Sequence, residues 1–299
     1  MTWFHENQKS IFYFAGLSLY GFLLYVLFVI LTFPKTQIQN WMLFQFQKAI
    51  QIEVTVSETR FTFPLGTEWK KIVFSPSGKP ETRFELDQMK IDFSPASFLF
   101  KRKMSAHFNL KGWGGEIRGA WTADGENNKT SRNSVAVEGE ELELGRLPWN
   151  KGVTIAGKVK FQTEYRWEAA DPGKGKGFIN IEGNEINGRG LSISGFNLPE
   201  IVVSRLTGHG ILRDGSMTID RFVSTGALAD LNGTGTILIS APFEKSLLNL
   251  SFKITPKEAL NKIVPLVFLS QGARPGVPMD LYLKGTLEQP AFTLTGAPT

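Results

Sequence analysis

The sequence of 299 residues contains no cysteine. A disulfide framework, a thiolate metal site and a cysteine nucleophile are therefore excluded. Because a chain without cysteine suits oxidising and reducing compartments equally well, this absence assigns no location.

Histidine is scarce as well, with only His5, His107 and His209, and no two of them have the spacing of metal ligands. We interpret each as a surface or turn residue. No G-x-S-x-G or GxxxxGK[ST] motif occurs, and the glycine pairs at 208–210 and 233–235 lack the third glycine of a dinucleotide loop. These pairs predict kinks or bulges in strands. We expect no catalytic residue, no metal ligand and no cofactor, and we therefore predict that the protein is not an enzyme.

The chain has no long run of charge of one sign. Its formal net charge is +5, but Lys and Arg alternate with Asp and Glu, and the densest basic run is only Lys101, Arg102 and Lys103. This pattern indicates a solvated surface rather than a nucleic-acid interface. An acidic group at 138–143 is typical of a strand edge that discourages strand addition, and a Ca²⁺ site there is the less favoured alternative.

One stretch, 11–33, has no charged residue at all, and Pro34 and Lys35 follow it. Its 23 residues exceed the roughly 20 apolar residues that a helix needs to cross a bilayer. A cleaved signal peptide would have a shorter apolar run followed by small residues, which are absent here. We predict a transmembrane anchor at 11–33 behind a leader at 1–10. The basic residues on its two sides nearly balance, so charge does not orient it. A short amphipathic helix is expected at 37–50, near the membrane or capping the sheet.

Beyond residue 50 the apolar residues recur with a period of two. Side chains alternate between the two faces of a strand, so this pattern predicts strands with one apolar and one polar face. The clearest example is 153–167, where the apolar face carries Val153, Ile155, Val159, Phe161, Tyr165 and Trp167. Two later strands are expected around 248–254 and 279–283. Shorter candidates lie at 52–57, 70–75, 82–93, 105–110, 116–122, 135–144, 178–182, 190–195, 201–206, 217–223 and 235–240.

Turns and loops between the strands are predicted from Asp-Gly and Asn-Gly pairs at 124–125, 214–215 and 232–233. Polar loops are expected at 122–134 and 169–177, and further helices at 95–101 and 256–269. With no clear boundary within it, 34–299 is expected to form one domain. The fold class is mainly β: an N-terminal transmembrane helix followed by a large, curved, mostly antiparallel sheet.

Residues 207–260 resemble the type II secretion system protein N family in its membrane-anchored form. The resemblance rests on Gly208 and Gly210, the Asp-Gly turn at 214–215, Gly233 and Gly235, and the S-x-L-N-L segment at 246–250. The closing segment 281–290 also resembles the ends of AsmA-like envelope proteins, and the segment IDFSPASFLFKRK at 91–103 resembles a short S-P-x-x-L helix common to both groups. These motifs are structural glycines and turns, and they carry no chemistry.

The resemblance implies an AsmA-like groove or open barrel on the periplasmic side of a bacterial inner membrane, in a Gram-negative cell. It implies a non-catalytic component of the type II secretion system whose partners are the membrane and other secretion-system subunits. Nucleic acid is not an expected partner.

Two hypotheses therefore remain open from the sequence. In the first, the domain contacts other subunits through the edges or faces of its sheet. In the second, the apolar face of 153–167 is a groove that binds the acyl chains of phospholipid, as the AsmA-like resemblance implies. A packed hydrophobic core would produce the same alternation, and the sequence favours this interpretation of the face itself.

Overall fold

The computed structural model describes residues 17–22, 24–25, 28, 37, 40, 43–44, 47, 52–62, 66–76, 83–94, 97, 103–124, 131–147, 152–190, 192–193, 196–197, 200–240, 242–259 and 276–295. The chain forms two compact units, Met1–Gln51 and Ile52–Thr299.

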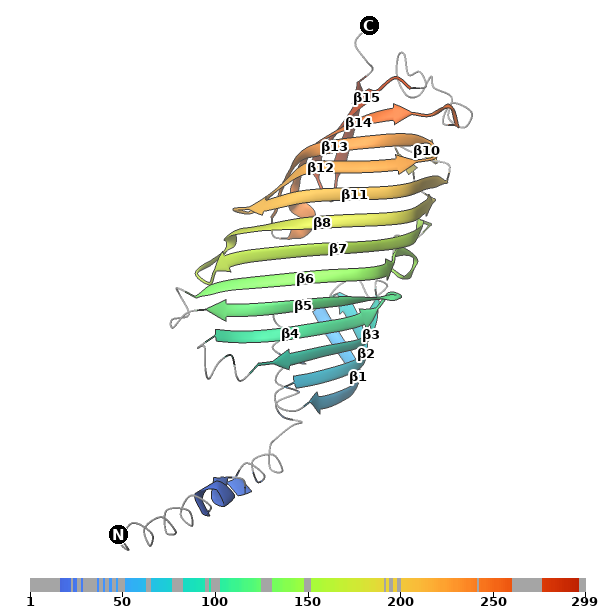
Figure 1. Cartoon of the computed structure of the whole chain (residues 1–299). Coiled ribbons are helices and arrows are strands. Elements are labelled where there is room, and N and C mark those ends of the chain that lie inside the picture. The colour runs from blue at the N-terminus through green and yellow to red at the C-terminus, as the bar shows by residue number, and fades with distance from the viewer. Residues whose placement is uncertain are drawn as a thin grey trace, which may run out of the picture. The chain divides into compact units, whose positions relative to one another are not determined.

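The second unit is built on one antiparallel sheet of 14 strands that follow one another in chain order (Figure 1). The strands are β1 (Ile52–Thr62), β2 (Gly66–Pro76), β3 (Phe84–Phe93), β4 (Lys103–Gly112), β5 (Gly115–Asp124), β6 (Arg132–Glu143), β7 (Thr154–Glu168), β8 (Asp171–Arg189), β11 (Ile201–Arg213), β12 (Ser216–Gly226), β13 (Ala229–Leu238), β14 (Leu247–Pro256), β15 (Met279–Thr286) and β16 (Pro290–Thr295). A small hairpin, β9 (Ser192–Ile193) with β10 (Phe196–Asn197), and two 3-10 turns, Leu144–Arg146 and Phe243–Lys245, complete the described elements. The expected mainly β, antiparallel fold is confirmed. Within the described residues the sheet is open, because β1 and β16 form its two edges.

Tight two-residue turns connect several strands. Trp113 and Gly114 between β4 and β5, and Asp214 and Gly215 between β11 and β12, all have positive φ, as a type I′ turn requires. The turn predicted at 214–215 is therefore confirmed. The turn predicted at 232–233 is wrong, because both residues lie within β13 and the chain reverses at 227–228 instead. Asn-Gly favours a turn only locally, and the pairing of β13 with β12 and β14 overrides this preference.

Other loop and helix predictions have mixed outcomes. The loop predicted at 169–177 is wrong beyond residue 170, because Asp171 begins the long strand β8. At 122–134 both ends belong to β5 and β6, while 125–130 lie outside the described residues. Of the helices predicted at 95–101 and 256–269, residues 97, 258 and 259 are helical, residue 256 ends β14, residue 257 lies in neither a helix nor a strand, and the rest lie outside the described residues.

β-Bulges interrupt the alternation in several strands. In β8, Glu185 and Ile186 together face Gly157 of β7, and Glu185 has φ 51°. The side of β8 that carries Gly183 therefore next carries Ile186, and Glu185 lies on the other side of the sheet. Similar register shifts occur in β6 near Glu141 and in β11 and β12. Each bulge places its extra polar residue on the side of the sheet that carries the charges, so the apolar side chains stay together on the other side.

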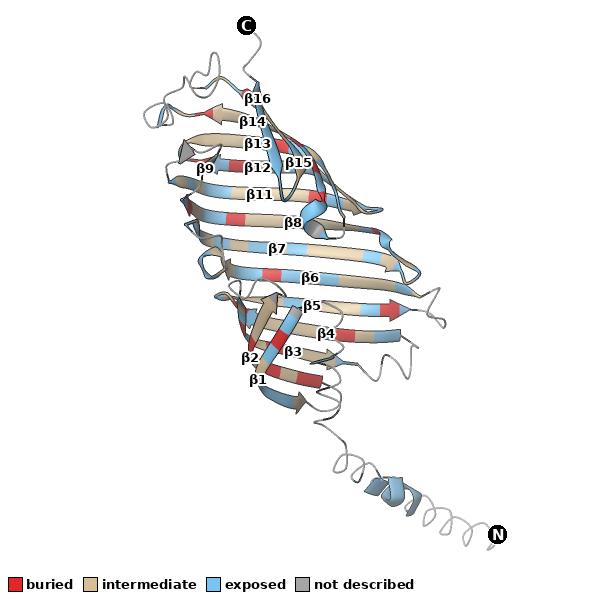
Figure 2. Ribbon diagram, turned by 180° about the vertical axis from the view of Figure 1, so that it is seen from behind, coloured by how far each residue is buried: buried red, intermediate tan, exposed pale blue. Residues whose placement is uncertain are grey.

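The sheet curls at both ends toward the same side, which faces the viewer in Figure 2. The most deeply buried apolar side chains lie in these curled ends. At one end they include Val54, Trp69, Ile72, Leu86 and Met89, which are at most 6% exposed, and at the other Leu248, Leu250 and Met279, at most 7%. The curl thus produces two small cores, separated by the wide middle of the sheet.

The first unit contains the segment predicted to cross a membrane. Most of 11–33 lies outside the described residues, but residues 17–22, 24, 25 and 28 are helical. Their large apolar side chains are 47–69% exposed. Among the residues that the structure describes, no helical stretch combines the length and hydropathy of a membrane-spanning helix. In the segment predicted to be an amphipathic helix, 37–50, the described residues 37, 40, 43, 44 and 47 are helical.

Candidate functional site

The six residues predicted to share an apolar face lie together. Ile155, Val159, Phe161, Tyr165 and Trp167 project from the same side of β7, and Val153 immediately precedes the strand. All six are half-buried. The rings of Tyr165 and Trp167 stack with their centroids 5.5 Å apart, and the Tyr165 hydroxyl donates a hydrogen bond to the Pro172 carbonyl at 2.9 Å.

The strand register extends this face across the whole sheet. Directly paired residues lie on the same side of a sheet, so a row can be traced from strand to strand. From β1 to β16, the row through Phe161 contains Thr59, Trp69, Met89, Leu110, Ile117, Gly139, Phe161, Ile181, Gly208, Phe222, Gly233, Phe252, Leu281 and Leu294. Neither this row nor the adjacent rows through Val159, Thr163 and Tyr165 contains a charged residue. We call this surface the apolar face.

Aromatic rings on the apolar face lie over glycines of neighbouring strands. A Cβ atom at Gly139 would clash with the ring of Phe161, one at Gly119 with Phe108, and one at Gly233 with Phe252. Each of these pairs is directly opposed in the register. The rings therefore lie flat against the sheet instead of standing up from it, which keeps the face smooth. Of the glycines found by sequence at 208–210 and 233–235, Gly233 belongs to this arrangement. The bulge opposite both glycine pairs has its extra residue in β12, so the bulges predicted in the strands of the pairs themselves are wrong.

The described residues place no second layer over the middle of the apolar face. Among the described residues of β6 to β13, no large apolar side chain is buried, whereas fully buried ones lie in the curled ends. Figure 2 shows exposed and half-buried residues along the central strands, with buried positions few among them. An ordinary domain covers the apolar side of a sheet with helices or another sheet. The central face is thus an apolar surface that the described chain leaves uncovered.

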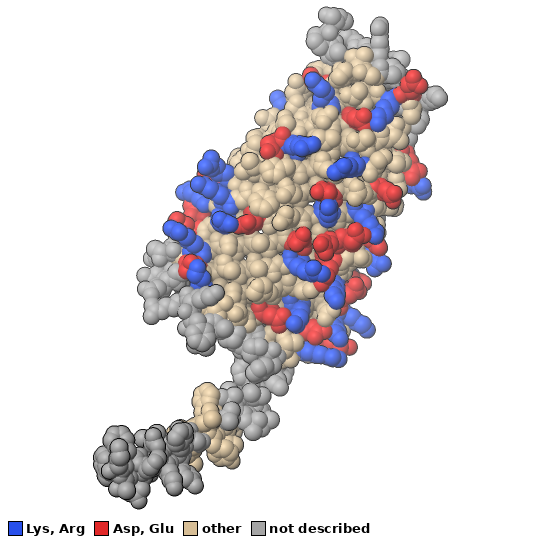
Figure 3. Space-filling view, in the orientation of Figure 1, with Lys and Arg blue, Asp and Glu red and all other residues tan. Residues whose placement is uncertain are grey.

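The opposite face is polar and carries the charges. Lys and Arg alternate there with Asp and Glu in Figure 3. Many form exposed pairs across strands, including Lys160 with Glu182 at 3.0 Å and Lys158 with Glu141 at 2.6 Å. Exposed pairs of this kind contribute about 0–1 kcal/mol each. These charged side chains favour contact of the polar face with water, and they define no site by themselves.

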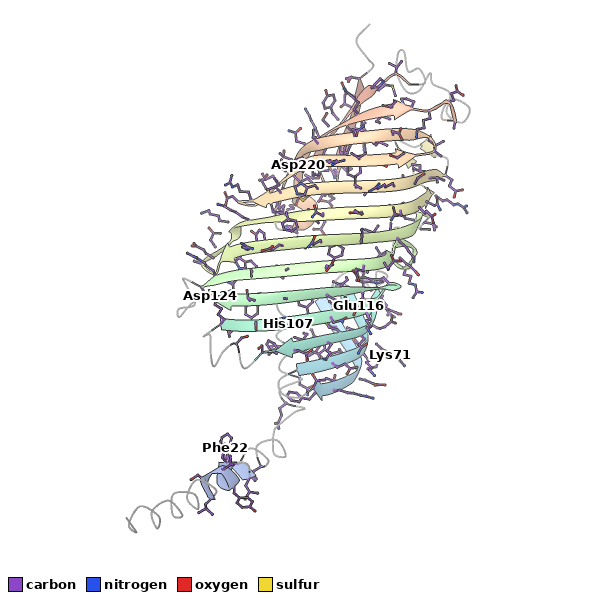
Figure 4. The ribbon with its side chains drawn as sticks, in the orientation of Figure 1. Phe22, Lys71, His107, Glu116, Asp124 and Asp220 are labelled. Atoms are coloured by element: carbon purple, nitrogen blue, oxygen red, sulfur yellow. The ribbon has the colours of Figure 1, made fainter. Side chains whose placement is uncertain are left out.

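A hollow of about 450 Å³ lies on the polar face over β6 to β12. It contains charges of both signs, among them Glu138, Lys160, Arg205 and Arg221. His209 lines it and lies 2.5 Å from Asp220, between Nδ1 and Oδ1. This hydrogen bond holds the pKa of Asp220 below its usual range. Figure 4 labels Asp220, Glu116 and His107, which belong to the polar face.

Among the described residues, no three His, Asp or Glu side chains form a group that could hold a metal ion. His107 is exposed on the polar face, and His209 is held by Asp220. The acidic residues at 138–143 separate at the β6 bulge, where Glu141 pairs with Lys158 and Glu143 with Arg146 at 2.7 Å.

Sequence reasoning found the apolar face on β7, β14 and β15 but missed its extent. The face on β8, β11 and β12 escaped notice because glycines and bulges interrupt the alternation there. The glycine-rich composition was the available signal, because glycines on this face lie directly opposite aromatic residues of the adjacent strand, as Gly233 does opposite Phe252.

Comparison with known proteins gives no assignment: no family model matches the chain, and neither a curated protein nor a solved structure matches it.

Proposed function

We propose that this protein binds the acyl chains of lipids on the apolar face, as a non-catalytic lipid-handling protein. The observation that carries the proposal is the uncovered middle of that face, where four adjacent rows contain no charged residue and the apolar side chains stay half-exposed. Six strands at about 4.8 Å spacing are about 29 Å wide, and four rows span about 20 Å along the strands, which gives roughly 600 Å². A contiguous apolar surface of this size is at the upper end for a monomer and usually marks a binding site.

The chemistry of the face fits hydrocarbon better than protein. A protein partner normally forms about one hydrogen bond per 100–200 Å² of interface. The middle of the apolar face offers few side-chain groups for this purpose. Thr163, the polar residue in the middle of β7, donates its hydroxyl hydrogen bond to the Phe178 carbonyl at 2.8 Å. An acyl chain needs no hydrogen-bonding partner and can follow the flat rings across successive strands.

A membrane anchor at 11–33 fits this function. Residues 17, 19, 20, 22, 24, 25 and 28 point in all directions around a helix, and their exposed apolar side chains suit a lipid environment better than water. An anchor there would tether the sheet beside a source of lipid. The family resemblance places this at the inner membrane, with the sheet in the periplasm, and that location is part of the proposal.

A second candidate function is a structural subunit of the type II secretion system. The residues that carry that resemblance lie on four consecutive strands, β11 to β14, and so form one contiguous part of the sheet. In this case the partners would be other periplasmic subunits. Proteomics of the culture medium from a deletion strain distinguishes the two, since selective loss of secreted proteins with normal membrane lipids supports the secretion subunit.

The lipid proposal is tested by charging the face. We expect the full chain, purified from membranes in mild detergent, to carry phospholipid, measured by mass spectrometry of the extract. Val159→Asp with Phe161→Asp should lower the lipid content at least about tenfold, because carboxylates are excluded from hydrocarbon. The side chains are half-exposed, so the strand signal in circular dichroism should persist.

The control places the same two charges on the other side of β7. Thr154→Asp with Gln162→Asp changes two exposed residues of the polar face and should leave the lipid content unchanged. Equal lipid in all three proteins would refute the proposal. If the first variant unfolds, Val159→Asn alone provides the milder test.

A further inference from the structure

The two edges of the sheet differ in their protection. Natural proteins blunt exposed edges with charged residues, which discourage pairing with another strand. β1 carries Glu53, Glu58 and Arg60. β16 has the sequence PAFTLT, without a charge, and its five described side chains are all exposed. Phe292, in the register of the apolar face opposite Leu283, is 48% exposed.

We propose that β16 pairs with β16 of a second copy of this chain, antiparallel, with Thr293 on the two-fold axis. This pairing joins the two sheets into one. Because the axis is perpendicular to the sheet, the apolar faces of both copies lie on the same side and become continuous. The closed symmetry also limits the assembly to a dimer, whereas pairing of β16 with β1 would build an open chain of copies.

The position of the proline selects the register. Pro290 has no N–H group to donate and suits only the end of a paired segment. With Thr293 on the axis, residues 291–295 of each copy face residues 295–291 of the other, and both prolines stay outside the paired segment. Phe292 of each copy then faces position 294 of the other, so the exposed ring gains an apolar neighbour.

The charges next to the edge agree with this register. On the polar face, Asp280 pairs with Thr295 and Lys284 with Ala291. Across the dimer seam, the row that begins with Asp280 in one copy therefore ends with Lys284 in the other, about three strand spacings or 14 Å away. No like charges meet across the seam. The contact is small, which places it among weak interfaces that need trapping to be observed.

Because the sequence contains no cysteine, a single introduced cysteine is the only thiol that can form a disulfide between two copies. In the full chain in native membranes, Thr293→Cys places two thiols opposite each other, with Cα atoms about 4.5–5.5 Å apart, within disulfide range. Mild oxidation should give at least about tenfold more disulfide-linked dimer than either control. The controls are Thr55→Cys on β1 and Thr236→Cys on the interior strand β13, both exposed threonines of the polar face.

Adding Phe292→Lys to Thr293→Cys should remove the cross-link, because a lysine at this position charges the edge. Cross-linking of Thr293→Cys no stronger than in the controls would overturn the dimer. Cross-links mainly to proteins of other masses would overturn it in favour of a different partner. Stronger cross-linking of Thr295→Cys than of Thr293→Cys would overturn the register. None of these three outcomes bears on the lipid proposal, which is tested separately by the amount of bound phospholipid.

Discussion

At the scale of single residues, glycine shapes the apolar face. A glycine opposite an aromatic residue lets the ring lie flat over the neighbouring strand, which also shields the glycine backbone from water. Phe161 over Gly139 is the central example. Rings that lie flat keep the apolar surface even, whereas rings that stand upright would divide it into separate pockets.

This arrangement predicts that Gly139→Ala destabilises the domain by about 1–2 kcal/mol, because the new methyl group displaces the Phe161 ring. The free energy of unfolding in urea measures the effect. Gly145→Ala is the matched control, since its Cβ would meet only the Ile155 carbonyl oxygen at 3.6 Å. It should change stability by less than about 0.5 kcal/mol. Equal effects of the two substitutions would contradict this role for Gly139.

At the scale of strands, bulges decide which residues lie on the apolar face. The strands whose faces the sequence predicts correctly, β7, β14 and β15, have no change of parity, and Leu248, Leu250 and Phe252 on β14 are an example. In β6 and β8 the alternation reverses partway, at Glu141 and Glu185. A strict period of two assigns half of each such strand to the wrong side. Nothing local in the sequence marks these positions, because neither is a glycine although both have positive φ.

The bulge in β8 yields a prediction at this scale. Glu185→Val places a β-branched residue at a φ of 51°, a backbone conformation that such residues strongly disfavour. We expect a loss of about 1–2 kcal/mol of unfolding free energy, measured in urea. Glu185→Gly keeps the bulge and suits its φ of 51°, so it should stay within about 1 kcal/mol of the parent. A valine variant as stable as Glu185→Gly would contradict this role of residue 185 in the bulge.

At the scale of the whole molecule, the sheet has a covered part and an uncovered part. The number and order of strands follow largely from alternation and turn signals, and the predicted antiparallel sheet is the one observed. Whether its apolar face is a core or an open surface could not be predicted, because both give the same alternation. That distinction depends on the curl, which closes the face over Trp69 and Ile72 at one end and over Met279 at the other, and leaves it open at Phe161.

The most direct measurement of the central claim compares two neighbouring residues of β7 that face opposite ways, Val159 and Lys160. A benzophenone side chain replaces each in turn in the full chain in living cells, and ultraviolet light links it to whatever it touches. We predict a phospholipid adduct at position 159, detected by mass spectrometry, and none at position 160. Adducts at both positions, or protein rather than lipid at position 159, would contradict the proposal that the apolar face binds acyl chains.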